Sequence, residues 1–204
     1  MQRRHADAAT VLTFWFGEDE PDDAKLARRQ RALWWSKNEA TDSEIAARFE
    51  SWVTAVAAGE LKTWAATPSG LLALILLTDQ FPRNIYRGTP QSFAYDPQAL
   101  RWSRNGLAKG MDRKLRPVQR VFFYLPFEHA ESRADQEQAL RLFQQLLDEV
   151  PDAQKAVFDG FMKFAVRHHD IIARFGRFPH RNAILGRKST AEEEAFLRTP
   201  GSSF

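Results

Sequence analysis

The sequence predicts an all-α protein with a single domain, and three observations support this fold class. Apolar side chains recur at the three- and four-residue spacing of a helix face through most of the chain. Ala and Leu, which favour helices, outnumber Ile and Val, which favour strands. No segment alternates polar and apolar residues as a half-buried strand does. Because the 204 residues contain no low-complexity linker, we expect one domain over residues 1–204.

Start and stop signals divide the chain into about eight helices with short connections. Ser, Thr and Asp side chains cap the first backbone N–H groups of a helix, and Gly commonly follows its last turn. In chain order, these signals predict helices over residues 8–16, 22–35, 41–59, 67–80, 96–110, 117–128, 132–150 and 152–175, and a short last helix from residue 190. Stacked antiparallel pairs of neighbouring helices are the arrangement that short connections favour.

The helices of the first half follow from particular residues. Gly17 ends the first, apolar helix, and Asp22 or Asp23 begins the second. The run Thr41-Asp42-Ser43-Glu44 has the spacing of a capping box, and Gly59 ends this third helix.

The fourth helix is expected to lie at the centre of the fold. Thr67 is a capping residue, and Pro68 suits the first helical position because it lacks the N–H that would be unsatisfied there. Residues 70–80 begin with apolar side chains all round, which is typical of a helix buried on every side.

The helices of the second half have similar start signals. Gly106 or Gly110 ends the helix from Asp96, and Gly176 ends the long helix from Asp152. The start signals in this half are Asp96-Pro97, Pro117, Ser132 with Asp135, Asp152, and Thr190.

The composition excludes several kinds of site. Without cysteine the chain has no disulfide, no thiolate zinc or iron–sulfur site and no Cys nucleophile. Its longest strongly apolar run, residues 71–77, is far shorter than the roughly 20 residues that span a bilayer. No apolar segment of signal-peptide type follows the charged N-terminus. We therefore expect a cytoplasmic protein with no membrane attachment.

Positive charge gathers in the second half of the chain, although the net charge is only +3. Such patches attract phosphates or nucleic acid, and they also occur as ordinary solvated helix faces. Because the net charge is small and no known nucleic-acid-binding motif is present, nucleic-acid binding ranks last among the functions considered. The two stretches are Arg101, Arg104, Lys109, Arg113, Lys114, Arg116 and Arg120, and Arg167, Arg174, Arg177, Arg181, Arg187 and Lys188.

Two distant segments resemble each other. Phe81-Pro82-Arg83-Asn84 is echoed by Phe178-Pro179-His180-Arg181-Asn182. We expect each Phe-Pro to end a helix, because a residue before proline avoids the helical conformation. The Arg and Asn side chains then either satisfy the last helical carbonyls or hold an anion. The sequence does not place the two turns relative to each other.

Glu128, His129 and His168 are the candidate acid–base residues. His168 shares a helix face with an apolar stripe, so it is either a hydrogen-bonded core residue or a pocket-lining base. Glu128-His129 follows Pro126-Phe127 at a predicted helix end, where the pair either caps the helix or performs acid–base chemistry. Asp79 and Arg83 are four residues apart and form an ion pair if the helix continues that far.

No metal ion and no cofactor is expected from the motifs. His129 and His169-Asp170 resemble part of the ligand set of helical metal-dependent phosphohydrolases, but no Asp follows Asp170 to complete it. The Glu-x-x-His pairs of di-iron bundles, the His-Glu-x-x-His zinc motif and the glycine-rich nucleotide loops do not occur.

Several long motifs resemble those of a known bacterial family. In their order and spacing, over roughly residues 9–204, they are similar to the family called domain of unknown function 924. The resemblance implies an all-α, tetratricopeptide-like superhelix and no established activity. The motifs are Phe14-Trp15-Phe16-Gly17, Trp34-Trp35, Thr78-Asp79-Gln80-Phe81-Pro82-Arg83-Asn84, residues 123–129 (FYLPFEH), residues 174–182 (RFGRFPHRN), Leu185-Gly186-Arg187 and Ser189-Thr190.

Two function classes therefore lead. The first is a binding module for a peptide, a protein partner or a small anionic ligand, for which helical scaffolds supply concave surfaces. The second is a small metal-independent enzyme in which Glu128, His129 or His168 transfers protons and arginines bind an anion, provided that these side chains converge. Whether the protein is an enzyme stays open at this point. The ligand-binding candidates are Asp79, Arg83, Asn84, Arg177, His180, Arg181 and Asn182.

Overall fold

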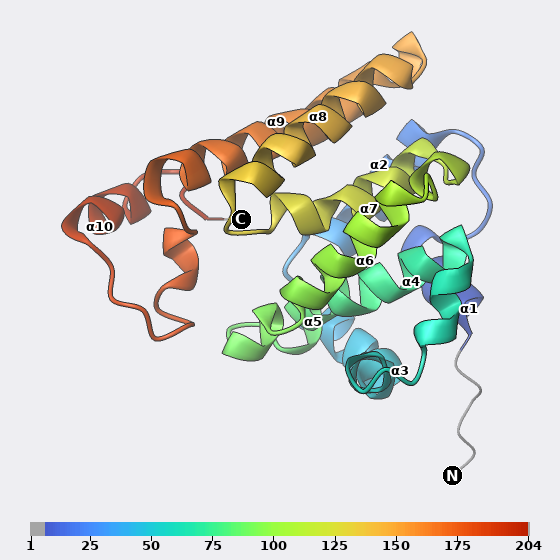
Figure 1. The fold of residues 1–204 in the computed structure, drawn as a ribbon, viewed down its shortest axis with the longest axis horizontal. Coiled ribbons are helices and arrows are strands. Elements are labelled where there is room, and N and C mark those ends of the chain that lie inside the picture. The colour runs from blue at the N-terminus through green and yellow to red at the C-terminus, as the bar shows by residue number, and fades with distance from the viewer. Residues whose placement is uncertain (1–6, 204) are drawn as a thin grey trace.

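The computed structural model describes residues 7–203, and these residues form helices and connecting turns without a strand (Figure 1). The predicted all-α class is confirmed, whereas the tetratricopeptide-like superhelix stays a prediction. The α-helices are α1 (Ala8–Phe16), α2 (Asp23–Trp35), α3 (Glu39–Ala57), α4 (Pro68–Thr78), α5 (Gln80–Ile85), α6 (Asp96–Ala108), α7 (Pro117–Glu128), α8 (Arg133–Glu149), α9 (Asp152–Phe175) and α10 (Ala191–Leu197). Short 3-10 helices cover Lys62–Ala66, Pro90–Phe93, Asp112–Lys114 and Pro179–Arg181.

Helix α4 lies at the centre of the fold, as its apolar sequence predicts. Every residue from Gly70 to Thr78 is buried. The helices α1, α3, α6 and α7 all pack against α4, so it has no face left for solvent. Thr67 caps α4 by accepting a hydrogen bond from the N–H of Gly70 at 3.1 Å. The polar residues that follow α4 are therefore placed at the edge of the main core.

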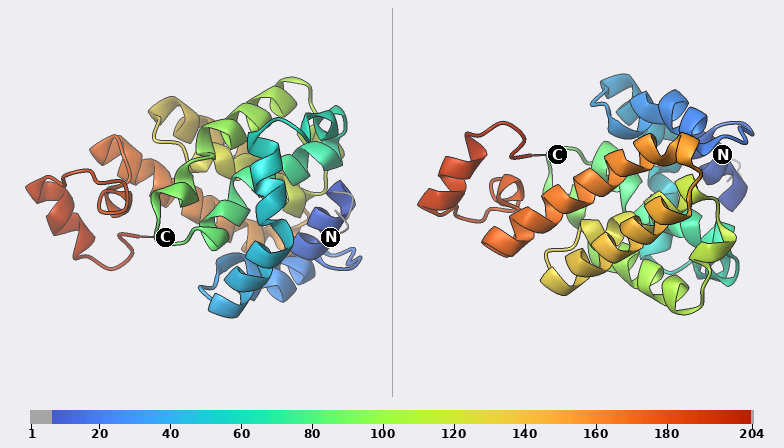
Figure 2. Two further views of the ribbon diagram at one scale, coloured as in Figure 1. Left: turned by 90° about the horizontal axis from the view of Figure 1, so that it is seen from below. Right: turned by 90° about the horizontal axis from the view of Figure 1, so that it is seen from above.

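Helices α8 and α9 form a long antiparallel hairpin that carries the C-terminal segment, defined here as residues 176–203 (Figure 1). In both views of Figure 2 this segment lies at the opposite end of the molecule from α1. It shares a small core with the end of α9, in which Ile171, Ile172 and Phe178 are buried against Phe175 and Phe196. Among the described residues, no helix is both long and apolar enough to cross a membrane.

Three predicted boundaries are wrong, each for a local reason. Helix α3 begins at Glu39 instead of near Thr41, because Asn38 caps it by accepting a hydrogen bond from Thr41 N at 3.0 Å. The helix expected over residues 67–80 ends at Thr78, and α5 begins at Gln80. Pro82 lies in the first turn of α5, and Pro179 opens a 3-10 helix. Phe-Pro therefore starts a helix in both turns, since proline is well suited to a first turn.

Gly106 lies inside α6, which ends at Ala108, so Gly110, with its φ of 61°, is the glycine that follows the end of this helix. A Cβ atom at Gly106 would lie 2.5 Å from Cζ of Phe123 and closer still to Cδ2 of Leu71. The missing side chain thus lets α6 approach α4 and α7 closely.

We predict opposite effects for two helical glycines. Gly106→Ala forces Phe123 and Leu71 apart and lowers the free energy of unfolding by about 2 kcal/mol. Gly160→Ala, in α9, meets nothing within 4 Å and raises it by about 0.5–1 kcal/mol through helix propensity. Thermal and urea unfolding of both variants measure the difference. Shifts of the same sign would contradict the close packing of α6.

Candidate functional site

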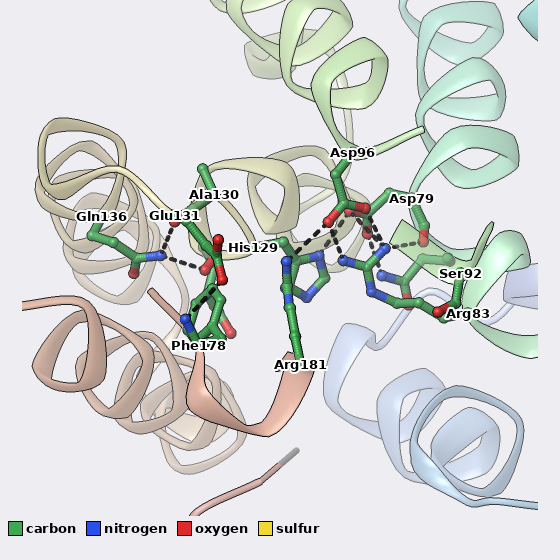
Figure 3. A network of polar contacts seen from close by, with 12 residues as sticks. Asp79, Arg83, Ser92, Asp96, His129, Ala130, Glu131, Gln136, Phe178 and Arg181 are labelled. Carbon is green, nitrogen blue, oxygen red and sulfur yellow. Dashed lines mark hydrogen bonds and ion pairs between the residues drawn. The ribbon is translucent and has the colours of Figure 1, made fainter. Parts of the chain in front are cut away.

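The two Phe-Pro turns meet at the carboxylate of Asp96, the first residue of α6. Arg83 of α5 donates to Asp96 Oδ1 at 2.8 Å and to Oδ2 at 3.0 Å. Arg181 of the 3-10 helix Pro179–Arg181 donates to Asp96 Oδ2 at 3.2 Å. In Figure 3 the two arginines approach this carboxylate from different sides. The structure thus joins segments that lie far apart in the sequence.

Asp79 lies in the break between α4 and α5, and its side chain is fully buried. Its Oδ1 contacts Nδ1 of His129 at 2.7 Å, and its Oδ2 accepts from Gln80 Nε2 at 2.5 Å. Nη1 of Arg83 lies 3.5 Å from Oδ1, so the ion pair expected from the sequence spacing is present although the helix is interrupted. A buried carboxylate is tolerated because these groups neutralise and hydrogen-bond it.

The environment keeps Asp79 ionised and His129 neutral. Burial alone would raise the pKa of Asp79, but the charge of Arg83 and the contact with His129 hold it below its usual value. Burial lowers the pKa of His129, and the positive charge of Arg83 lowers it further. A neutral His129 that donates from Nδ1 to Asp79 presents Nε2 as its other ring nitrogen. Carboxylate-oriented imidazoles of this kind serve both as bases and as metal ligands.

Glu128 and His168 lie beside this pair. Both are buried, and Oε1 of Glu128 is 2.9 Å from Nδ1 of His168. The same Nδ1 also lies 2.9 Å from the carbonyl oxygen of Phe164, one helical turn earlier. Glu128, His129 and His168 each offer one ligand atom, and the three atoms lie within 4.8 Å of one another. The three candidate acid–base residues therefore converge.

Arg181 is buried between two aromatic rings. Its guanidinium carbon lies 4.6 Å from the ring centre of Phe93 and 4.5 Å from that of Phe178. Its Nε is buried and makes no hydrogen bond within the described part of the chain. Burial, together with the nearby charge of Arg83, lowers the pKa of Arg181 to about 10. Arg181 is thus a desolvated cation with incomplete pairing.

Two of the ligand-binding candidates fasten the C-terminal segment instead of joining this cluster. Arg177 donates from Nε and Nη2 to the two carboxylate oxygens of Glu193, at 2.7 and 2.8 Å. Asn182 donates to Ser189 Oγ at 3.0 Å and to Glu193 Oε2 at 3.2 Å. Their prediction as site residues finds no support in these contacts, because their donors are used within the segment.

Asn84 and His180 also have local roles. Asn84 donates to Oδ1 of Asp42 at 2.8 Å, and Arg87 binds the same carboxylate, which ties α5 to α3. The ring of His180 packs against Phe178 with centroids 5.6 Å apart, and burial together with Arg181 lowers its pKa to about 3. His180 is therefore neutral near pH 7 and adds no charge to the site.

Two carboxylates that organise the cluster were not predicted as site residues from the sequence. Asp96 was interpreted only as a helix start, although it pairs both arginines. Glu131 accepts from the N–H of Phe178 at 2.8 Å and from Arg187 at 2.6 and 2.9 Å, and it so anchors the second turn. Asp96 is the first residue of α6, and Glu131 lies between α7 and α8. A position at a helix end is the one feature of the local sequence that could have marked these two carboxylates.

The cluster is reached from solvent through three side chains. Arg83, Asp96 and His129 are exposed by 20%, 16% and 13% respectively. Two surface hollows of about 470 and 420 Å³ lie elsewhere, along α8 and the first half of α9. Their lining residues include Leu140, Gln144 and Met162 in one and Lys155 in the other, and none belongs to the cluster.

We predict that Glu193 is needed to hold the C-terminal segment. Glu193→Gln weakens the bidentate contact with Arg177 and destabilises the segment by about 2 kcal/mol, the scale of a buried hydrogen-bonded charge. Glu192→Gln is the matched control, because its contact with Arg174 is exposed and contributes at most about 0.5 kcal/mol. Amide hydrogen exchange over residues 176–203 measures both. Equal protection in the two variants would contradict the role of Glu193.

The same contact predicts a pH dependence. Hydrogen bonds from Arg177 lower the pKa of Glu193 to about 2, below the roughly 4.3 of an unfolded chain. The stabilisation is therefore present above about pH 4.3 and is lost as the pH falls toward 2. Wild-type amide protection in the segment should decrease over this range, and Glu193→Gln should remove that component of the decrease.

Comparisons with known proteins agree with the resemblance seen in the motifs. A protein of unknown function from Agrobacterium tumefaciens, whose structure is solved, has 38% sequence identity and a TM-score of 0.79, over 94% of this chain and 96% of that one. No curated protein matches the chain. Residues 11–201 match the family of bacterial proteins of unknown function DUF924. The chain therefore belongs to the DUF924 family.

Proposed function

We propose that this protein binds a small anionic ligand, through a carboxylate or phosphate group, at Arg181 and Arg83. The observation that carries the proposal is the incomplete pairing of Arg181. A guanidinium group has five N–H donors. For Arg181 the contacts are one 3.2 Å hydrogen bond to Asp96 and two aromatic faces, while Nε is buried without a partner among the described residues.

A buried cation of this kind is costly unless an anion completes its pairing. Arg83 donates to both oxygens of Asp96 in a bidentate contact, whereas Arg181 makes one longer hydrogen bond to the same carboxylate. A carboxylate or phosphate beside Arg181 would satisfy its open donors and gain two parallel hydrogen bonds. Asp96 would remain with Arg83, which keeps the site assembled.

The partly exposed groups define the approach to this site. Arg83 and His129 line the same cluster, and both remain within reach of solvent. Aromatic walls from Phe93 and Phe178 hold the guanidinium plane of Arg181 in place, which reduces the entropy lost on binding. A small ligand suits this arrangement better than a peptide, because a single buried arginine recognises one acidic group.

The enzyme alternative has one specific observation in its favour. It requires Glu128, His129 and His168 to converge, and their candidate atoms lie within 4.8 Å of one another. The contact of Asp79 with His129 adds an oriented imidazole. These contacts bring acid–base groups together but do not indicate which substrate bond an enzyme would break. Anion binding is therefore the more specific proposal.

We predict that the wild-type protein, treated with a chelator, binds inorganic phosphate or a small dicarboxylate such as succinate. A ligand at 100 times its Kd adds about 2.7 kcal/mol to the free energy of unfolding, or roughly 5–10 °C in Tm at this size. Arg181→Lys keeps the positive charge but removes the planar guanidinium group that binds an anion through two parallel hydrogen bonds. The affinity for the anion should therefore fall at least about tenfold. Calorimetric titration measures the Kd, and thermal unfolding checks that each variant is folded.

The control is Arg174→Ala, which removes an exposed arginine paired with Glu192 and should leave the Kd unchanged. Wild-type protein that binds neither phosphate nor dicarboxylate with a Kd below about 1 mM, a free energy of about −4 kcal/mol, would overturn the proposal. Equal affinity in Arg181→Lys would place the anion elsewhere and would also overturn it.

A further inference from the structure

We infer that Glu128, His129 and His168 form a binding site for one divalent transition-metal ion of the zinc type. Two imidazoles and one carboxylate are the ligand set that commonly holds such an ion with a position left for water or substrate. The three residues come from the last turn of α7, the residue that follows it and the second half of α9. The site thus forms where the α8–α9 hairpin returns to the main core.

The spacing of the ligand atoms fits a single ion after a small adjustment. Each residue offers one atom, and these atoms lie within 4.8 Å of one another. Zinc binds nitrogen and oxygen at about 2.0–2.2 Å, so the ligands of one ion lie roughly 3–4 Å apart. Oε1 of Glu128 is already 2.9 Å from Nδ1 of His168, and rotation of the carboxylate would separate these two atoms and turn the oxygen toward the ion.

The orientation of both histidines is an independent observation that points to a metal. Ligating histidines characteristically donate from one ring nitrogen to a carboxylate or a backbone carbonyl, which fixes the ring for the metal. Nδ1 of His129 contacts the buried carboxylate of Asp79 at 2.7 Å. Nδ1 of His168 contacts the carbonyl oxygen of Phe164 at 2.9 Å. Each of the two usual kinds of orienting partner is therefore present, one for each histidine.

The local charge also accommodates a cation. Asp79 and Asp96 offset the charges of Arg83 and Arg181, with which they pair. Glu128 then supplies a further negative charge, and it is buried. A buried carboxylate gains stability from a cation that it ligates directly. Imidazole nitrogens select zinc, cobalt, nickel or ferrous iron over magnesium and calcium, which prefer oxygen ligands.

No metal was expected from the sequence because the ligands were sought in known motifs, of which the phosphohydrolase pattern came nearest. That pattern used His169-Asp170, but Nδ1 of His169 faces Oδ1 of Asp170 at 3.4 Å on the exposed side of α9. The histidine that reaches Glu128 is the neighbouring His168. The metal site is a proposal separate from anion binding, and the two share the surroundings of His129.

The test uses full-length protein freed of metal by chelation and then dialysed. Competitive titration with Zn²⁺ should give one ion per chain, and Co²⁺ should develop visible ligand-field bands that Zn²⁺ abolishes. Glu128→Gln and His168→Asn should each weaken Zn²⁺ binding at least about tenfold, the scale of a lost ligand or of its orienting partner. Asp79→Asn, which changes the partner of His129, should weaken it about 10–100-fold.

The matched control is His169→Asn, which removes the adjacent, partly exposed imidazole and should leave the affinity unchanged. If the ligand variants do not fold, X-ray absorption of the wild-type zinc complex decides, and it should show two imidazoles and a carboxylate oxygen. Three results would overturn the proposal: no stoichiometric binding by wild-type protein, unchanged affinity in folded Glu128→Gln and His168→Asn, or a coordination shell without imidazole. The anion titration is done in the presence of chelator, so it does not depend on a bound metal. Each proposal can therefore be tested even if the other fails.

Discussion

The burial of one carboxylate, that of Asp79, is the constraint around which the rest of the site is arranged. Asp79 follows the apolar helix α4, which is enclosed on all sides, so its charge cannot reach water. Its partners must come from the protein, and they are Gln80, Arg83 and His129. Because removing a partner from a buried charge costs several kcal/mol, α5 and the end of α7 are held where these groups meet.

A second carboxylate, Asp96, joins this centre to the C-terminal segment. Arg83 belongs to the main core and Arg181 to the segment, and both bind Asp96. Glu131 adds a parallel link, because it binds the N–H of Phe178 and the side chain of Arg187. The small core around Ile172 and Phe178 is too limited to position the segment alone, so polar contacts complete the attachment. The proposed anion site and the attachment of the segment therefore share Arg83, Asp96 and Arg181.

The two proposed sites have complementary charges. Arg181 is a buried cation with open donors, whereas Glu128 is a buried anion paired with an imidazole. The first arrangement calls for an anion and the second accepts a cation, and His129 lies in the surroundings of both. Such a juxtaposition resembles sites where a metal and an arginine together hold an acidic ligand.

The sequence by itself determined the features that depend on neighbouring residues. Thr67, Ser132 and Thr190 cap the helices that they were predicted to cap, and the apolar run of α4 is central. These effects act within one helical turn, so local sequence is sufficient. The two Phe-Pro pairs were wrongly predicted to end helices, because proline is as compatible with the start of a helix as with the region after its end.

Only the tertiary structure decided which candidate residues meet. Asp79 and His129 meet where α4 packs against α7, and Glu128 and His168 meet where α7 packs against α9. Arg83 and Arg181 meet at Asp96, the first residue of α6. Arg177 and Asn182 lie in the same turn motif as Arg181, yet Glu193 engages both within the segment. Local sequence carries no information about such distant pairs. Their contacts arise when separate helices bury their apolar faces against each other, and that burial sets where the polar residues at the helix ends come to lie.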